Sequence, residues 1–265
     1  MKDLGKPFAH GRTADVYDWA DGEVLKLYRS EYSTDIIEQE RAVSEIVNRA
    51  GIPSPEVGDI VEVEGRYGIV FERIAGLSML HAISRSPWLT VRYAKMLAGL
   101  QARLHEVGGP KDLPSQRERL ARKIRLAGKR LDEATIAKAL VILDSLPDGS
   151  SLCHGDFHPD NILMTSSGPV IIDCVDVGRG NPVCDVARTS ILVNMAAIPE
   201  DKSNSRLLSL GRTLSHAAYI KAYSKIRPID RAELDKWRIV NAAGRLCERI
   251  PEEKRLVAFV ETRLA

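Results

Sequence analysis

One stretch, residues 153–173, constrains the fold of this 265-residue chain more than any other. Its first part, Cys-His-Gly-Asp-Phe-His-Pro-Asp-Asn-Ile-Leu, contains a glycine and a proline that interrupt regular structure, so we expect a tight loop over 154–160. Its second part has two short apolar runs, 161–164 and 170–172, with Thr-Ser-Ser-Gly-Pro between them, which predicts two strands around a turn. The stretch therefore predicts a loop followed by a β-hairpin.

Three polar side chains occupy key places in this stretch. Asp156 lies in the predicted loop, Asn161 begins the first strand, and Asp173 ends the second. Each alone would be read as a turn or strand-end residue. Phosphoryl transfer needs such a set, because one aspartate accepts the proton of the attacking hydroxyl while an asparagine and a second aspartate hold Mg²⁺ on the phosphates. The set predicts Asp156 as the catalytic residue, a general base or orienting group, and Asn161 and Asp173 as metal ligands.

The same region resembles a known family. The motifs are His-Gly-Asp at 154–156, Asn161, Ile-Asp at 172–173, Gly-Arg-Gly-Asn-Pro at 178–182 and Asp-Val-Ala at 185–187. They look like the catalytic loop and metal-binding aspartate of the aminoglycoside phosphotransferase and choline kinase family, small-molecule kinases with a protein-kinase-like fold. The family usually has a tryptophan after the metal-binding aspartate, whereas this chain has Cys174. That departure concerns packing beside the metal and not the ligand itself.

The resemblance implies an α+β, two-lobed protein-kinase-like fold. Residues 1–75 would form a nucleotide-binding lobe with an antiparallel sheet, and residues 76–265 a mainly helical lobe for catalysis and substrate binding. The residue pattern agrees, since strands are indicated over 5–30, 60–64 and 68–73 and helices over 34–50, parts of 78–142, 186–195, 204–225, 230–249 and 252–264.

Two short segments of the N-terminal region are candidates for holding phosphate. A turn of small residues at Gly11-Arg12-Thr13 can present backbone N–H groups to phosphate, although the Gly-x-Gly-x-x-Gly pattern of protein kinases is absent. Lys26 lies in an apolar strand, where alternation alone would allow it to face solvent. The resemblance implies instead that Lys26 contacts the α- and β-phosphates and that a glutamate of the following helix holds it.

The partner of Lys26 and the adenine contacts are also implied by the resemblance. Glu38, Glu40 and Glu45 all lie on the predicted helix, and Glu40 matches the spacing of the family. Residues 68–76 resemble the strand and hinge that join two lobes, so the backbone of Glu72 and Ile74 would bond the adenine edge. An edge strand that ends in a turn fits the local sequence equally well.

Several other residues have a structural interpretation. His105 is expected to be structural, and Asp185 to support the catalytic loop rather than take part in chemistry. Asp176 could position substrate or join the metal environment. The basic run over 117–130 fits the solvated surface of a helix. Three aromatic side chains are expected in the core: Tyr219, Tyr223 and Trp237.

Composition limits the partners. The net charge of +2 gives no argument for nucleic acid or a membrane surface. No apolar run reaches about 18 residues, and the N-terminus lacks the apolar region of a signal peptide. The four cysteines have no metal-ligand spacing and are expected to be reduced thiols. We therefore expect a cytoplasmic protein without a membrane or nucleic-acid partner.

The expected activity is Mg-dependent transfer of the γ-phosphate of ATP or GTP to a hydroxyl of a small molecule. A kinase for choline, ethanolamine or sugar-type metabolites is an alternative, because lysines and arginines outnumber glutamates in the last thirty residues and a polycationic acceptor prefers carboxylates. A non-catalytic nucleotide-binding homologue is disfavoured by the intact set of Asp156, Asn161 and Asp173. A protein kinase is disfavoured because no activation segment or Ala-Pro-Glu motif follows Asp173.

Overall fold

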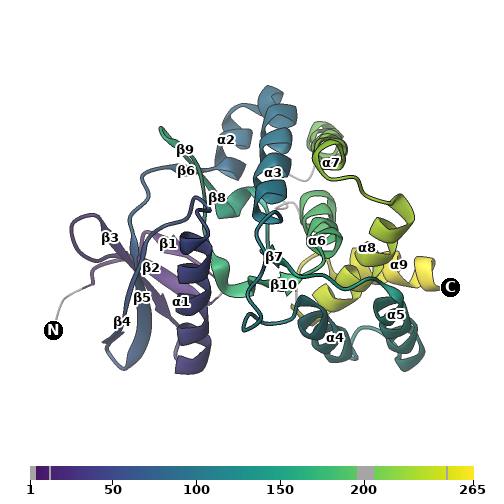
Figure 1. The fold of residues 1–265 in the computed structure, drawn as a ribbon, viewed down its shortest axis with the longest axis horizontal. Coiled ribbons are helices and arrows are strands. Elements are labelled where there is room, and N and C mark those ends of the chain that lie inside the picture. The colour runs from purple at the N-terminus through teal and green to yellow at the C-terminus, as the bar shows by residue number, and fades with distance from the viewer. Residues whose placement is uncertain (1–3, 12, 196–205, 249) are drawn as a thin grey trace. The chain divides into compact units, whose positions relative to one another are not determined.

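The computed structural model describes residues 4–11, 13–195, 206–248 and 250–265, and the chain forms two compact units (Figure 1). The first unit falls within Met1–Met79 and Asp160–Val175, and the second within Leu80–Pro159 and Asp176–Ala265. The first is built on antiparallel sheets and one long helix, whereas the second is mainly helical. This architecture confirms the expected α+β class. The division into functional domains at residues 75 and 76 stays a prediction.

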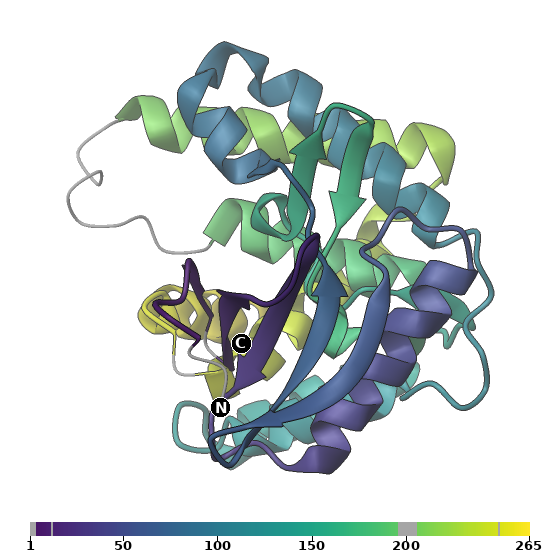
Figure 2. The ribbon, with the colours of Figure 1, turned by 90° about the vertical axis from the view of Figure 1, so that its left-hand side faces the viewer.

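A five-stranded antiparallel sheet forms the larger part of the first unit (Figure 2). In spatial order its strands are β1 (Ala9–His10), β2 (Ala14–Asp18), β3 (Glu23–Tyr28), β5 (Arg66–Glu72) and β4 (Val57–Val63). The turn between β4 and β5 consists of Glu64 and Gly65, at φ of 53° and 73°. Two such left-handed residues match the right-handed twist of a hairpin, so this short turn can join β4 directly to β5.

Alternation along β3 separates two buried faces of the sheet. Leu25 and Leu27 belong to one core cluster, together with Tyr17 and Val70. Tyr28 belongs to a second cluster, in which helix α1 (Thr34–Arg49) contributes its own apolar side chains. Because side chains two residues apart in a strand share a face, β3 directs Lys26 to the same face as Tyr28. Lys26 is thus turned toward α1 and not toward open solvent.

The predicted hairpin that carries the metal-site candidates is confirmed. Strand β8 (Ile162–Thr165) pairs antiparallel with β9 (Gly168–Ile171), and β6 (Leu77–Ser78) adds a third strand beside β8. The turn is shorter than predicted, since Thr165 pairs directly with Gly168. Gly168 permits this because its φ is 126°, a value that residues with a Cβ rarely adopt.

Helices make up most of the second unit (Figure 1). They are α2 (Met79–Arg85), α3 (Thr90–Leu104), α4 (Gln116–Leu126), α5 (Glu133–Ser145), α6 (Pro182–Met195), α7 (Arg206–Ile226), α8 (Arg231–Arg245) and α9 (Glu253–Leu264). Helix α3 packs on α7, and α8 contacts α4, α5, α6 and α9. Strand β7 (Ser151–Cys153) pairs antiparallel with β10 (Gly178–Gly180). The side chains of Tyr219, Tyr223 and Trp237 are fully buried, which confirms their interpretation as core residues.

Two helix boundaries differ from the prediction by four residues. Helix α6 begins at Pro182, four residues earlier than expected, because Asn181 caps it with a side-chain oxygen that accepts the N–H of Val183 at 2.7 Å. Helix α8 ends at Arg245, and a short 3-10 helix, Leu246–Glu248, follows it. Among the described residues, every helix is too short or too polar to cross a membrane.

Candidate active site

Lys26, Glu40 and Asp173 form one ion cluster in the first unit. Lys26 Nζ lies 2.6 Å from Glu40 Oε1 and 2.8 Å from Asp173 Oδ1. The Lys26 and Glu40 side chains are only 15% and 1% exposed, whereas the Asp173 side chain is 44% exposed. The ammonium group is therefore held by a buried carboxylate on one side and by an accessible carboxylate on the other.

Helix α1 selects Glu40 among the three candidate glutamates. Glu40 lies on the buried face of the helix, and the Tyr28 hydroxyl donates a hydrogen bond to its second carboxylate oxygen. Glu38 is exposed, and Glu45 pairs with Arg49 at 2.6 Å along the helix. Glu40 is thus placed to fix Lys26, and its role in phosphate binding stays a prediction.

Burial and nearby charges have opposite effects on the pKa of Lys26. Burial alone disfavours the charged ammonium, but the nearby charges of Glu40 and Asp173 outweigh this cost and raise the pKa of Lys26 above its usual value. Lys26 is therefore a permanent cation at any physiological pH. A permanent cation next to an accessible carboxylate is suited to a ligand that carries both phosphate and a metal ion.

Asp173 and Asn161 are brought together by the hairpin. The N–H of Ile172 donates to the carbonyl of Asn161 at 3.0 Å, so Asp173 directly follows a residue bonded to Asn161. Asp173 has a φ of 63°, which is unusual for a residue with a Cβ and turns the chain out of the strand. Both side chains offer hard oxygen atoms, so the pair fits Mg²⁺ chemically. Their role as metal ligands stays a prediction.

Cys174 fills the position after Asp173 where the resembling family has tryptophan. Its thiol is buried, contacts Ser44 of α1 by a hydrogen bond, and has a pKa raised to about 12 by burial and by the charges of Glu40 and Asp173. A thiol with this pKa is protonated and unreactive at neutral pH. Cys174 is therefore a packing residue beneath the ion cluster.

The catalytic-loop candidate lies in the second unit and depends on Gly155. This residue has a φ of 79°, and a Cβ there would lie 2.3 Å from the carbonyl oxygen of Asp176. Its N–H donates to Asp185 Oδ1 at 2.7 Å, and the N–H of His154 donates to Asp185 Oδ2 at 3.0 Å. Asp185, on α6, thus supports the loop as expected, and the loop presents Asp156.

Asp156 is partly buried beside Arg188 and His158. Its side chain is 17% exposed, its Oδ1 accepts from Arg188 Nη2 at 3.2 Å, and its Oδ2 lies 3.4 Å from His158 Nε2. Burial alone would raise the pKa of Asp156, but the His158 hydrogen bond and the Arg188 charge overcome it and hold that pKa well below its usual range. Asp156 is therefore an ionised carboxylate at neutral pH.

Arg188 and Glu248 complete this environment, and neither was singled out in the sequence. Arg188 Nη2 contacts Glu248 at 2.8 Å and 3.1 Å, while Arg245 and Lys123 also pair with Glu248 at 2.9 Å and 3.2 Å. Arg188 directly follows the Asp-Val-Ala motif, and this position is the one sequence signal that could have marked it as a neighbour of the catalytic loop. Glu248 comes from the 3-10 helix after α8, and no local pattern marks it.

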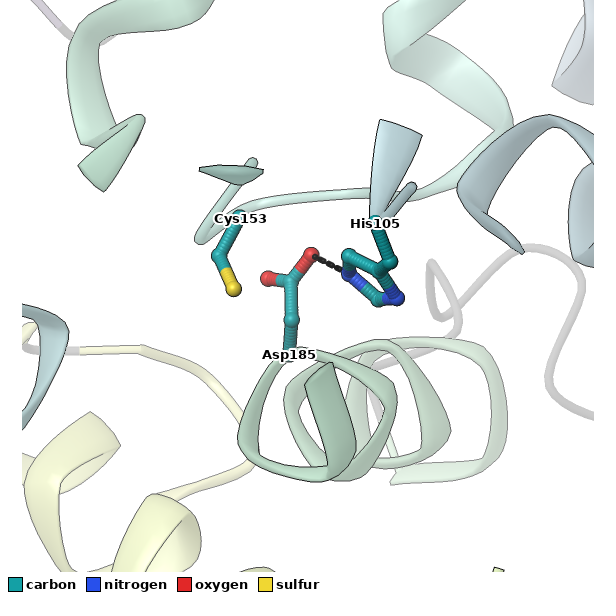
Figure 3. Close-up of side chains that lie close together, drawn as sticks. All are labelled: His105, Cys153 and Asp185. Atoms are coloured by element: carbon teal, nitrogen blue, oxygen red, sulfur yellow. Dashed lines mark hydrogen bonds and ion pairs between the residues drawn. The ribbon is translucent and has the colours of Figure 1, made fainter. Parts of the chain in front are cut away.

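His105, Cys153 and Asp185 form a buried cluster beneath the loop (Figure 3). Their residue types resemble a metal site, but hydrogen bonds account for the arrangement. Asp185 Oδ2 accepts from Gln101 at 3.0 Å and lies 3.1 Å from His105 Nε2, while burial keeps the pKa of the Cys153 thiol well above its usual value. These hydrogen bonds fit the structural interpretation of His105, which stays a prediction.

The phosphate-turn candidates lie between β1 and β2. The N–H of Gly11 donates to the carbonyl of Ala14 at 2.8 Å, and the carbonyl of Thr13 accepts from the N–H of Arg29 at 3.0 Å. These bonds fix the backbone of Gly11 and Thr13. Arg12 lies outside the described residues. The assignment of Gly11, Arg12 and Thr13 to phosphate binding stays a prediction.

The hinge candidates lie at and after the end of β5. The N–H of Glu72 donates to the carbonyl of Glu56 at 2.9 Å, so a contact from Glu72 to a base would have to use its carbonyl oxygen. Ile74 lies two residues beyond the strand and is half-buried. The adenine contacts of Glu72 and Ile74 stay predictions.

The chain as a whole is similar to known proteins. The family model described as the phosphotransferase enzyme family matches residues 5–229. No curated protein sequence gives a significant match. An aminoglycoside-3'-phosphotransferase of type VIII is similar in structure, with a TM-score of 0.60 and 21% identity over 91% of this chain and 92% of that chain.

Two further solved structures show the range of relatives. An aminoglycoside phosphotransferase from Streptomyces rimosus, in complex with ADP and streptomycin, gives a TM-score of 0.56 and 19% identity over 89% of this chain and 94% of that chain. A choline kinase from Cryptosporidium parvum gives a TM-score of 0.58 and 13% identity over 98% of this chain and 87% of that chain. At these identities the similarity shows the fold, which is the expected kinase-like one.

Proposed function

The chain belongs to the phosphotransferase enzyme family, and from this premise we propose that it transfers the γ-phosphate of ATP or GTP to a hydroxyl of a small molecule. The observation that carries the proposal is Lys26 Nζ between Glu40 and Asp173, at 2.6 Å and 2.8 Å. A lysine fixed by a helix glutamate beside an accessible aspartate is the arrangement that positions nucleotide phosphates in kinases. The ADP bound in the Streptomyces rimosus structure supports nucleotide use.

In the proposed reaction the acceptor oxygen forms a bond to the γ-phosphorus. The bond between that phosphorus and the oxygen bridging to the β-phosphate breaks, and the nucleoside diphosphate leaves. Asp156 accepts the proton of the acceptor hydroxyl or its hydrogen bond, and its ionised state keeps it ready to do so. Mg²⁺, held by Asn161 and Asp173, would neutralise the charge that develops on the phosphates.

The remaining nucleotide contacts are part of the same proposal. Lys26 contacts the α- and β-phosphates while Glu40 keeps the ammonium in place. The backbone at Gly11 and Thr13 faces phosphate, and Arg12 belongs to the same turn. The carbonyl of Glu72 and the N–H of Ile74 bind the adenine edge.

The acceptor class has two candidates from the relatives. The Streptomyces rimosus structure contains streptomycin, whereas the Cryptosporidium parvum relative is a choline kinase. Either an antibiotic or a metabolite alcohol is therefore compatible with the fold.

Among the described residues the cysteines are free thiols, three of them buried, which supports the reducing cytoplasm as the location. We propose no nucleic-acid or membrane partner.

Nucleotide binding tests the proposal directly. At a concentration 100 times the dissociation constant, Mg-ATP or Mg-GTP should stabilise the protein by about 2.7 kcal/mol and raise its Tm. Asp173→Ala should remove most of the Mg²⁺ dependence of this shift, whereas Asp144→Ala, an exposed change on α5, should leave it intact. If calorimetry detects no nucleotide binding in the presence of Mg²⁺, the proposed function is wrong.

A non-catalytic homologue would give a different result. It would bind nucleotide but consume none with any acceptor. Purified protein should therefore be screened for nucleotide consumption against a panel of aminoglycosides, amino alcohols, sugars and hydroxy acids. Consumption that requires one class of acceptor supports a kinase, and its absence across the panel supports the non-catalytic alternative.

A further inference from the structure

A small cavity lies against the catalytic-loop candidate within the second unit. Its volume is about 30 Å³, and its wall includes Gly155, the residue before Asp156. A cavity of this size holds about two water molecules or a group of similar size, such as a carboxylate. It is therefore a compartment for one substituent of a ligand and not for a whole ligand.

Cations dominate the wall of this cavity. Four cationic side chains line it, whereas Asp176 is the one carboxylate among the described lining residues; the four are Arg119, Lys123, Arg188 and Arg245. Glu248 pairs with three of them, yet it is not a lining residue. The side chains that line the cavity are therefore mainly cationic, and Glu248 compensates three of them in part.

One of these cations has an unused donor. The Arg188 side chain is 6% exposed, and within the described part of the chain its Nε has no hydrogen-bond partner. Its Nη2 is already bonded to Asp156 and Glu248. A buried donor without a partner is unfavourable, and an anionic oxygen at Nε would satisfy it. Because Arg188 lines the cavity, an anionic group there would lie beside a guanidinium whose hydrogen bonds are incomplete.

Arg119 is a second lining cation that could accept an anionic partner. Burial lowers the pKa of Arg119, and the Asp176 charge offsets only part of that effect. The Asp176 carboxylate lies 3.6 Å from Arg119 Nη1 and 3.7 Å from Lys123 Nζ, longer than the 2.7–2.9 Å of a charge-assisted hydrogen bond. The two cations are therefore incompletely compensated by Asp176.

We propose that this cavity binds a carboxylate-sized anionic group of the acceptor, so that the substrate class is hydroxy acids and not polycations. This inference rests on the proposed function, because it assigns the cavity to the acceptor of the same reaction. Gln116 also lines the cavity, and within the described residues its Oε1 has no hydrogen-bond partner, so this oxygen suits a hydroxyl donor on the same molecule.

Arg188 connects the cavity to the chemistry. The guanidinium that would meet the anion at Nε is the same one that contacts Asp156 at Nη2. Binding an anion at one edge of Arg188 therefore fixes the group that orients Asp156. A neutral alcohol would leave the buried donor unpaired, and a cationic acceptor would meet four cationic lining side chains and one lining carboxylate. The cavity thus discriminates by charge.

Calorimetry with matched probes tests the proposal on the full chain. Glycerate is compared with glycerol, and gluconate with sorbitol, because each pair differs mainly in one carboxylate. We expect each acid to bind at least about tenfold more tightly than its neutral partner. Arg119→Gln and Lys123→Gln should each weaken the acids by about tenfold or more, since each removes a charge-assisted contact. Lys123 is half-buried, so Lys123→Gln still tests the proposal if Arg119→Gln fails to fold.

Arg125→Gln is the matched control. Arg125 lies on α4 like Arg119 and Lys123, but it is exposed and does not line the cavity. Its variant should bind the acids as the native chain does. Equal affinity for acids and neutral alcohols, or losses no larger in Arg119→Gln and Lys123→Gln than in Arg125→Gln, would overturn the inference.

Titrations repeated with Mg-ADP separate this inference from the proposed function. Acids that bind at the cavity should not compete with Mg-ADP, whereas acids that bind at the phosphate contacts would compete, and that result would overturn the inference. A protein that binds Mg-ADP but prefers no acid keeps the proposed function and loses this inference. A protein that prefers acids but binds no nucleotide loses the proposed function.

Discussion

Asp185 holds the backbone of Gly155 through a partly buried hydrogen bond of 2.7 Å between residues 30 positions apart in the chain. The same carboxylate accepts the N–H of His154 at 3.0 Å, and its side chain is completely buried. A buried carboxylate is stable only when its oxygens are fully bonded, so α6 and the loop depend on each other. The position of Asp156 is therefore set by the packing of α6.

Removing the Asp185 carboxylate should destabilise the whole second unit. Asp185→Ala leaves the N–H groups of His154 and Gly155 and the Gln101 amide buried without their acceptor. We expect a loss of at least about 3 kcal/mol in the free energy of unfolding, measured by urea denaturation. Asp144→Ala, an exposed substitution on α5, should change it by less than about 0.5 kcal/mol. Equal effects of the two changes would contradict this account of the loop.

Asp185 also predicts a dependence of stability on pH. Burial disfavours its charge, but the hydrogen bond and charge of His105 prevail and lower its pKa from 3.8 to about 2. A carboxylate whose folded pKa is depressed stabilises the fold fully above its unfolded pKa, and this contribution is lost as the pH falls through the folded value. The difference in unfolding free energy between the native chain and Asp185→Asn should be constant above about pH 5 and shrink between about pH 4 and pH 2. A difference that stays constant down to pH 2 would show that the charge of Asp185 is not what stabilises the loop.

Gly155 should tolerate no side chain. A Cβ at its φ of 79° would lie 2.3 Å from the Asp176 carbonyl oxygen, so Gly155→Ala combines backbone strain with a clash against the main chain. We expect a loss of more than about 2 kcal/mol in unfolding free energy. Gly22→Ala is the matched control, because Gly22 has a φ of 75° with nothing within 4 Å of its Cβ position. That variant should lose about 1 kcal/mol from strain alone. Similar losses for both variants, measured by urea denaturation, would mean that the approach of Asp176 is unimportant.

Local pattern predicted the elements that carry the candidate site. The hairpin after Asn161 and the helix that bears Glu40 were both predicted, because strand alternation, turn residues and helical spacing are properties of neighbouring residues. The contact of Lys26 with Glu40 needed the resemblance to choose among three glutamates. Burial on the inner face of α1 is the physical reason for the selection of Glu40.

The basic run over 117–130 was only partly predicted. Its interpretation as a solvated face holds for Arg122 and Arg125, which are exposed, but it is wrong for others. Arg117 donates to the carbonyls of Leu143 and Leu146, and Arg119 donates to the carbonyls of the 176–177 segment. The sequence could not show this, because the acceptors lie more than twenty residues away in the chain. The pair of Arg188 and Glu248 could not be predicted for the same reason, because 60 residues separate them in the chain.

Lys26 and Glu40 should act as a unit. Because Glu40 holds the ammonium at 2.6 Å, Lys26→Ala and Glu40→Ala remove the same phosphate contact. The loss in kcat/KM of the double variant should therefore be smaller than the product of the two single losses, with a coupling of about 0.5–3 kcal/mol. The control pairs Lys26→Ala with Glu45→Ala, since Glu45 pairs with Arg49 instead. This second cycle should be additive, and additivity in both cycles would contradict the positioning role of Glu40.

Asp156→Asn should separate chemistry from folding at the catalytic loop. The amide keeps the shape of the side chain and can still face Arg188 and His158, so we expect near-normal unfolding free energy and nucleotide affinity. It cannot accept the hydroxyl proton, and kcat with the true acceptor should fall by about 10²–10⁴-fold. Asp160→Asn, which alters an exposed acid of the same segment, should retain turnover.

Since the pKa of Asp156 lies well below its usual range, its protonation should not reduce kcat anywhere near neutral pH. A variant with full turnover would remove Asp156 from the mechanism, whereas one that cannot fold would give it a structural role.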